Sequence, residues 1–303
     1  YYYNGGYILD EITFQKEFPE SPLEPMSEST LAEVPGWITT GNYALNWIIS
    51  KKFMGGLPLG RVIIFSGDPS SGKSMIALSM MREKSIDYII YLDSEGGGAS
   101  KDFATFLGID PKNILYSQVD TVEGLIARMR LVIDMIEKNK TKRNILMVVD
   151  SISMLSTDKE MNPEAGSDMG NRAKTVRSFF RQYIRKMQKL NICAVFTAHL
   201  TENIGGYGPS KVLSGGGTVL SFAPSVEVRF SRVNADSEVE QSAKGASMIK
   251  IRAEVVKSRL GTYGKRVKFD LDMARGLDAY AGLADIMKDY SFLIPAAKDL
   301  VEQ

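Results

Sequence analysis

The 303-residue sequence has one cysteine, one histidine and no long hydrophobic run. The lone Cys193 excludes an internal disulfide and, within its apolar surroundings, favours a reducing compartment. No apolar run approaches the roughly 18 residues that cross a bilayer, and no segment resembles a signal peptide. We therefore expect a cytoplasmic protein that does not bind a membrane.

The formal net charge is only +1, but the charges are segregated along the chain. Residues 1–35 carry seven acids and one lysine, whereas residues 170–190 carry seven bases and no acid. Such segregation attracts a polyanion to one region and repels it from another. Charge alone leaves two interpretations of the basic segment open, a nucleic-acid-binding stripe or a solvated helix.

The most specific motif is a complete phosphate loop, Gly-x-x-x-x-Gly-Lys-Ser, between a predicted strand and a predicted helix. Its residues are Gly67, Asp68, Pro69, Ser70, Ser71, Gly72, Lys73 and Ser74. This arrangement directs backbone N–H groups and the positive end of a helix at one point. The glycines allow the tight turn, the lysine reaches the outer phosphates and the serine can ligate Mg²⁺. The motif predicts a site for a nucleoside triphosphate and Mg²⁺.

Strands and helices are predicted to alternate after a Pro-, Glu- and Ser-rich arm at 1–35. Strands are predicted at 61–67, 88–93, 145–150 and 192–199, and helices at 74–84, 121–138 and 170–190. Three later strands are predicted at 225–233, 247–257 and 266–272, before a short helix and tail at 282–303. The pattern predicts an α/β fold: a mostly parallel central sheet flanked by helices, with an antiparallel extension at one edge.

Polar residues follow the predicted strands where ligands of parallel sheets bind. Asp150 ends one strand, so we expect it beside the phosphate loop, holding Mg²⁺ together with Ser74. Glu95 follows another and is a candidate for polarising the attacking water. A ribose-binding acid is the competing role, but the Gly-Lys-Ser signature argues against a dinucleotide site. His199 ends a third strand; a lone histidine is often structural, but here it is placed to sense the γ-phosphate.

Two long connections, 156–170 and 200–217, flank the basic helix. Connections of this length in a compact domain are usually functional or disordered. Arg177, Arg181 and Arg185 recur every four residues and so form one stripe. Loops over a basic stripe are typical of a groove that tracks single-stranded nucleic acid.

Taken together, these features resemble the RecA family of strand-exchange recombinases, and most closely its tailed-phage UvsX branch. The resemblance runs from about Gly36 to Gly282. Besides the phosphate loop, its markers are the segments 92–95, 149–151, 168–170, 214–218, 255–259 and 276–278. It implies a RecA-like P-loop NTPase with an ATPase core at 36–281. The acidic arm or linker at 1–35 does not match the family's N-terminal helix and is a candidate polymerisation segment. At 282–303 the resemblance implies a short remnant of the family's larger C-terminal region.

The resemblance also implies roles for individual residues. A catalytic group comprises Lys73, Glu95, His199, Lys257 and Arg259, the last two reaching the ATP of a neighbouring subunit. Phe103 is implied to stack on adenine. DNA contacts are implied for Met169, Gly170, Lys174, Arg181, Ile204 and Gly205, in addition to Arg177 of the stripe. RecA itself has glutamine at the position of His199, whereas the phage branch has histidine.

The implied function is that of a DNA-dependent ATPase, with ATP and Mg²⁺ as cofactors. It would form filaments on single-stranded DNA, pair them with homologous duplex DNA and exchange strands in recombination, repair and recombination-dependent replication. A mediator and a single-strand-binding protein are the expected partners, in the host cytoplasm if the protein is phage-encoded. A hexameric helicase and an ATP-switched mediator without strand exchange are the alternatives. The 255–259 motif and the glycine-rich second loop favour the recombinase, and Glu95 with Lys73 argues against a non-catalytic mediator.

Overall fold

The protein is described by a computed structural model, whose chain separates into the units 1–34 and 35–303. The structure describes residues 33–97, 100–139, 143–162, 169–202, 211–215, 217–233, 240–241 and 247–290. Nearly all of the predicted acidic arm lies outside these residues. All of the described helices and strands belong to the second unit.

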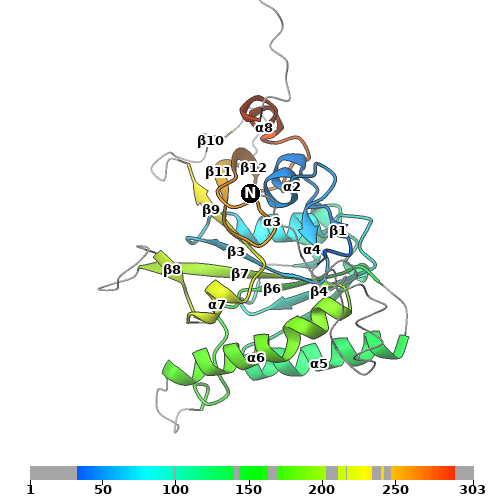
Figure 1. The fold of residues 1–303 in the computed structure, drawn as a ribbon, viewed down its shortest axis with the longest axis vertical. Helices are drawn as coiled ribbons and strands as arrows, with labels where there is room; N and C mark the ends of the chain where they lie inside the picture. The colour runs from blue at the N-terminus through cyan, green and yellow to red at the C-terminus, as the bar shows by residue number, and fades with distance from the viewer. Residues whose placement is uncertain are drawn as a thin grey trace, which may run out of the picture. The chain divides into compact units, whose positions relative to one another are not determined.

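Six parallel strands form the centre of the main sheet, in the order β9-β3-β7-β6-β4-β5. They are β3 (Val62–Gly67), β4 (Tyr88–Asp93), β5 (Ile114–Gln118), β6 (Ile145–Asp150), β7 (Ile192–Glu202) and β9 (Val226–Arg232). The inner strands are continuous apolar runs because helices cover both faces of the sheet. The α/β class and the mostly parallel sheet are therefore confirmed (Figure 1).

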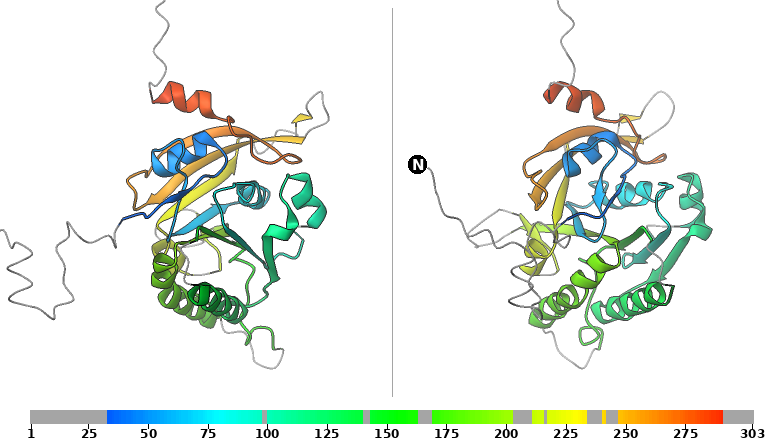
Figure 2. Two further views of the ribbon diagram at one scale, coloured as in Figure 1. Left: turned by 90° about the vertical axis from the view of Figure 1, so that its right-hand side faces the viewer. Right: turned by 45° about the vertical axis from the view of Figure 1, so that its right-hand side comes forward.

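Helices cover the two faces of the sheet and create two apolar cores (Figures 1 and 2). One face carries α2 (Tyr43–Ser50), α3 (Lys73–Met80) and α4 (Lys101–Phe106), and the other carries α5 (Val122–Asn139) and α6 (Met169–Lys189). Alternate strand residues enter opposite cores because side chains of a strand point to opposite faces. In β3, for example, Phe65 packs on the first side and Ile64 on the second.

The antiparallel extension consists of β11 (Ser247–Ser258), β12 (Arg266–Asp272) and the short β10 (Glu240–Gln241). One part of the prediction was wrong: β9, within the predicted strand 225–233, pairs parallel with β3 and is antiparallel only to β11. The chain reaches β9 through β8 (Lys211–Leu213) and α7 (Val219–Phe222), and such a crossover returns a strand in parallel. The antiparallel part therefore begins one strand later than predicted.

Several short elements carry no strong signal in the sequence. These are β1 (Trp37–Ile38), β2 (Leu57–Pro58), the 3₁₀ turn η1 (Pro111–Asn113), β5, β8 and α2. Asn42 caps α2, because its Oδ1 accepts the N–H of Leu45 at 2.7 Å. Its amide also donates to the carbonyls of Asp278 and Ala281, which ties α2 to the segment before α8 (Leu283–Asp289). Within the described ranges, no helix is long and apolar enough to span a bilayer.

Candidate active site

The strand register brings the predicted polar residues to one edge of the sheet. Gly67 pairs with His199 across β3 and β7, and Asp93 pairs with Asp150 across β4 and β6. Because these strands are parallel, their carboxyl ends meet at the same edge, where ligands of such sheets bind. The phosphate loop, Asp150, Glu95 and His199 therefore form one candidate site.

The phosphate loop turns sharply from β3 into α3. Gly72 has a φ of +85°, and a Cβ on Gly67 would lie 2.3 Å from the carbonyl oxygen of Phe230. Lys73 Nζ donates to the carbonyls of Gly67 at 3.1 Å and Asp68 at 2.9 Å. Burial lowers the pKa of Lys73, and nearby carboxylates oppose the shift. The Lys73 ammonium, held by these hydrogen bonds, and the N–H groups at the N-terminus of α3 together suit the phosphates of a nucleotide.

Asp150 is a buried carboxylate surrounded by hydroxyl donors. Oδ1 accepts from Ser74 Oγ at 3.1 Å and from Thr197 Oγ1, and Oδ2 accepts from Tyr91 Oη at 2.7 Å. Burial raises the pKa of Asp150, and the hydrogen bonds from Thr197, Tyr91 and Ser74 oppose that shift. The hydroxyl of Ser74 and the carboxylate are hard oxygen donors that suit Mg²⁺. A Mg²⁺ ion held by these two side chains would offset the negative charge of the nucleotide phosphates.

A turn stabilised by Asp93 holds Glu95. The two oxygens of Asp93 accept the backbone N–H groups of Glu95 and Gly96, both at 2.9 Å, and of Gly97 at 3.3 Å. Tyr116 Oη donates to the same carboxylate at 3.0 Å. These contacts place the backbone of Glu95 beyond the end of β4, facing the neighbouring strands.

The Glu95 carboxylate contacts His199, with Oε1 lying 3.0 Å from Nε2. This hydrogen bond is the main reason that the pKa of Glu95 is lowered, and the charge of Lys73 contributes. An ionised carboxylate near Lys73 lies at the phosphate end of the site, which favours a water-positioning role over a ribose-binding one. The N–H of His199 donates to Ser153 Oγ at 2.8 Å, and its carbonyl accepts from Ser214 at 2.8 Å.

The basic stripe of α6 is exposed to solvent. Lys174, Arg177, Arg181 and Arg185 lie on the outer side, while Val176, Phe179, Phe180, Tyr183 and Met187 are buried against the sheet. The helix is therefore amphipathic: its apolar side packs against the sheet, and its other side presents a row of cations to the solvent. Met169 and Gly170 open this helix, whereas Ile204 and Gly205 lie outside the described residues.

The remaining predicted residues lie on other elements. Phe103 is partly buried on α4 and packs against the first apolar core. Lys257 Nζ donates to the carbonyl of Ser221, and Arg259 donates to that of Phe222 at 2.7 Å, so both cations bind the C-terminal end of α7. Burial lowers the pKa of Lys257 to about 8.

Several residues that contact the site were not predicted from the sequence, and four of them bind its side chains or hold its turns. Tyr91 and Thr197 hold Asp150, Tyr116 holds the turn of Glu95, and Lys211 binds Asp68 of the phosphate loop at 2.7 and 2.9 Å. The only signal for Tyr91 and Thr197 is a hydroxyl within a strand that is otherwise largely apolar, and Tyr116 lies on β5, which was not itself predicted. No motif in the sequence around Lys211 indicates its contact with the phosphate loop.

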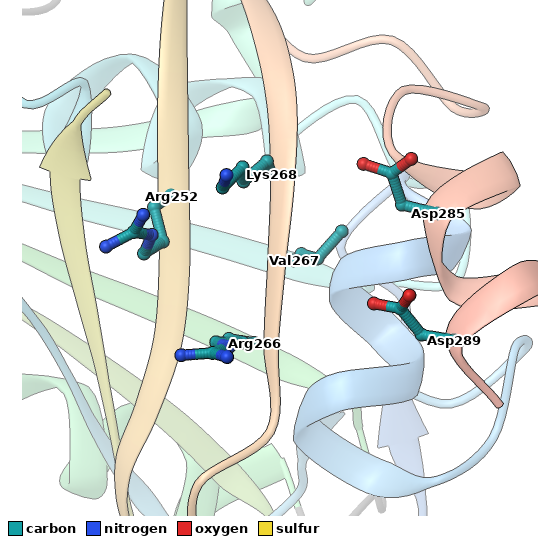
Figure 3. A pocket seen from close by; sticks show the side chains of 6 residues that line it. All are labelled: Arg252, Arg266, Val267, Lys268, Asp285 and Asp289. Carbon is teal, nitrogen blue, oxygen red and sulfur yellow. The ribbon is translucent and has the colours of Figure 1, made fainter. Parts of the chain in front are cut away.

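A charged cavity of about 300 Å³ lies apart from this site, between β12 and α8 (Figure 3). It is lined by Arg252, Arg266, Val267, Lys268, Asp285 and Asp289. On the face opposite Arg252, Arg266 and Lys268, Leu271 and Ile251 approach Gly72 of the phosphate loop. The antiparallel strands therefore separate this cavity from the candidate active site.

The fold and this edge define a phosphate-loop nucleotide-binding protein of the α/β class. The RecA N-terminal domain family matches residues 9–278, and the chain belongs to the RecA family, a family of DNA-dependent ATPases and recombinases. Protein RecA of Cytophaga hutchinsonii is 26% identical over 275 residues, covering 90% of this chain and 74% of that protein. Protein RecA of Clostridioides difficile is 27% identical over 278 residues, covering 91% and 76%.

Proposed function

We propose that this protein is an ATP-dependent DNA recombinase. It forms a helical filament on single-stranded DNA, pairs that strand with homologous duplex DNA and exchanges strands. The observation that carries this proposal is the 3.0 Å contact between Glu95 and His199. It joins the candidate catalytic carboxylate to β7, the strand that leads toward the second proposed DNA loop. A contact of this kind couples the state of the nucleotide to the DNA-binding surface.

The residues of the carboxyl edge have complementary roles in ATP hydrolysis. Lys73 and the N–H groups at the start of α3 bind the phosphates, and Ser74 with Asp150 holds Mg²⁺. Glu95 orients the attacking water, and Phe103 packs against the adenine. The fixed charges of the edge stabilise the negative charge that develops on the transferred phosphoryl group.

DNA binding is assigned to α6 and the two long connections. The exposed cations Lys174, Arg177 and Arg181 follow the phosphate backbone, while Met169, Gly170, Ile204 and Gly205 contact the stretched strand. Binding that depends on phosphate contacts is independent of sequence and weakens steeply with salt. Base pairing with the duplex then supplies the sequence selection.

Self-assembly is assigned to an open edge of the sheet. β5 pairs only with β4 among the described strands, and beside it Leu115, Tyr116, Leu131 and Met135 are exposed around an apolar groove of about 180 Å³. An open strand edge next to an apolar groove suits an extended segment of a second copy. Lys257 and Arg259 would reach the nucleotide of a neighbouring subunit, so that only the assembled filament has a complete site.

The branch of the family and the partners of the filament are proposed on separate grounds. Membership of the phage UvsX branch rests on His199, which replaces the glutamine of RecA itself. Two partners are also proposed. One is a single-strand-binding protein, which the filament must displace from the DNA, and the other is a mediator that loads the filament.

Strand exchange between labelled oligonucleotides tests the proposal. The protein is incubated with Mg²⁺, ATP and single-stranded DNA, then mixed with a duplex whose strands carry a fluorescence donor and quencher. We expect strand separation with a homologous duplex. We expect none with a heterologous duplex, and none when nucleotide is left out. Lys73→Ala is the matched negative control. DNA-stimulated ATP hydrolysis without strand exchange would contradict the recombinase assignment.

A further inference from the structure

An ion pair joins the phosphate loop to β8, a strand that lies within the second predicted connection, 200–217. Lys211, the first residue of β8, donates to both carboxylate oxygens of Asp68, at 2.9 and 2.7 Å. Asp68 is the second residue of the phosphate loop. The two side chains are 42% and 48% exposed, so the pair contributes little to stability. The pair is therefore placed to act on phosphate binding and not to stabilise the fold.

Lys211 belongs to the same antiparallel pair of strands as His199. β7 and β8 pair through Leu200 with Leu213 and Glu202 with Lys211. This pair therefore touches the nucleotide edge at two points: His199 contacts Glu95, and Lys211 contacts Asp68. Any change of partner at Lys211 acts directly on β8.

Asp68 places a negative charge beside a site built for another anion. Its backbone carbonyl accepts from Lys73, while its carboxylate forms an ion pair with Lys211. The negative charge of a triphosphate bound in the loop would be repelled by the Asp68 carboxylate. The Lys211 ammonium lies against that carboxylate and can offset this repulsion. Lysine has a flexible stem and three donors, so it can change acceptor without a backbone shift.

We propose that Lys211 is a second phosphate-binding cation, in addition to Lys73. In the structure it pairs with Asp68, and on ATP binding its ammonium turns to the terminal phosphate. The proposal rests on the proposed ATP-binding function and deepens it. Lys211 is thereby a determinant of specificity for a triphosphate over a diphosphate, and its movement reports the terminal phosphate to the paired strands β7 and β8.

Equilibrium binding of fluorescent mant-ATP and mant-ADP, with Mg²⁺ and without DNA, tests the proposal. For Lys211→Met we expect triphosphate affinity to fall roughly tenfold or more, the value of one charge-assisted hydrogen bond, with little change for the diphosphate. Asp68→Asn removes the competing carboxylate and frees the lysine, so affinity for the triphosphate should rise relative to that for the diphosphate. Lys211→Arg retains the cation and should retain most of the preference for the triphosphate.

Arg143→Met is the matched control. It breaks a similarly exposed pair with Asp87, 3.6 Å apart before the start of β4, at the amino edge of the sheet. Its binding of both nucleotides should equal that of the wild type, and thermal unfolding checks that all variants are folded. The proposal is overturned if Lys211→Met and Asp68→Asn weaken both nucleotides equally, as for a structural ion pair, or if Lys211→Met binds like the wild type. A wild-type protein that binds neither nucleotide would overturn the proposed function itself.

Discussion

Replacing Tyr91 by phenylalanine tests whether the buried hydroxyls of the site hold Asp150 in place. Tyr91 is fully buried, and its hydroxyl donates to Asp150 Oδ2 at 2.7 Å. Among the described residues, the other two side-chain donors to this carboxylate, Ser74 and Thr197, bind Oδ1. The substitution keeps the ring stacked against Tyr116 and removes only the donor.

The expected cost follows from the charge and burial of the acceptor. A hydrogen bond to a charged group contributes about 1.5–3 kcal/mol, and Asp150 is only 2% exposed, so water cannot replace the lost donor well. We expect Tyr91→Phe to lower the free energy of unfolding by about 2 kcal/mol. For a domain of this size, the melting temperature should fall by roughly 4–8 °C.

Urea unfolding of the nucleotide-free protein measures this change. The transition midpoint should move while its slope stays constant, because the surface exposed on unfolding is unchanged. Tyr116→Phe is the matched control: its hydroxyl also binds a carboxylate, Asp93, but its side chain is half exposed, so we expect a loss below about 1 kcal/mol. Equal midpoints for Tyr91→Phe and the wild type would refute the reasoning, as would a larger loss in the control.

Three further predictions concern catalysis, charge and assembly. Glu95→Gln should keep ATP-dependent DNA binding while phosphate release falls about 100-fold or more; unchanged release would mean that another group orients the water. The pKa of Lys257 is lowered to about 8, so the unfolded chain holds this proton more tightly. Wild-type stability should therefore rise between about pH 8 and 10.5 relative to Lys257→Met, and parallel curves would contradict this. Leu131 is 64% exposed, so Leu131→Glu should leave the fold intact and shorten filaments in electron micrographs; full-length filaments would exclude the apolar groove as the contact.

The central part of the site was predictable from the sequence because its logic is local. A phosphate loop between a strand and a helix is recognisable alone, and an acid after a buried strand lies at the ligand edge of a parallel sheet. Asp150 ends β6 and Glu95 follows β4, whereas His199 lies within β7, which runs three residues further than the predicted strand; their meeting requires only that the strands be parallel.

The missed contacts depend on pairings between distant segments. Tyr91 and Asp150 are 59 residues apart and meet because β4 pairs with β6, and Lys211 meets Asp68 across 143 residues. The parallel direction of β9 is likewise set by the crossover through α7, not by its own residues. Composition and spacing predict the longer strands, but neither the short ones nor which neighbour each strand takes.

Negative-stain electron microscopy with single-stranded DNA, Mg²⁺ and a slowly hydrolysed ATP analogue tests the central claim most directly. A recombinase should form helical filaments on the DNA that are absent without nucleotide and absent for Lys73→Ala. Closed rings would instead indicate a ring-shaped motor on the same fold. Isolated particles under all conditions would contradict the assignment of filament assembly to this chain.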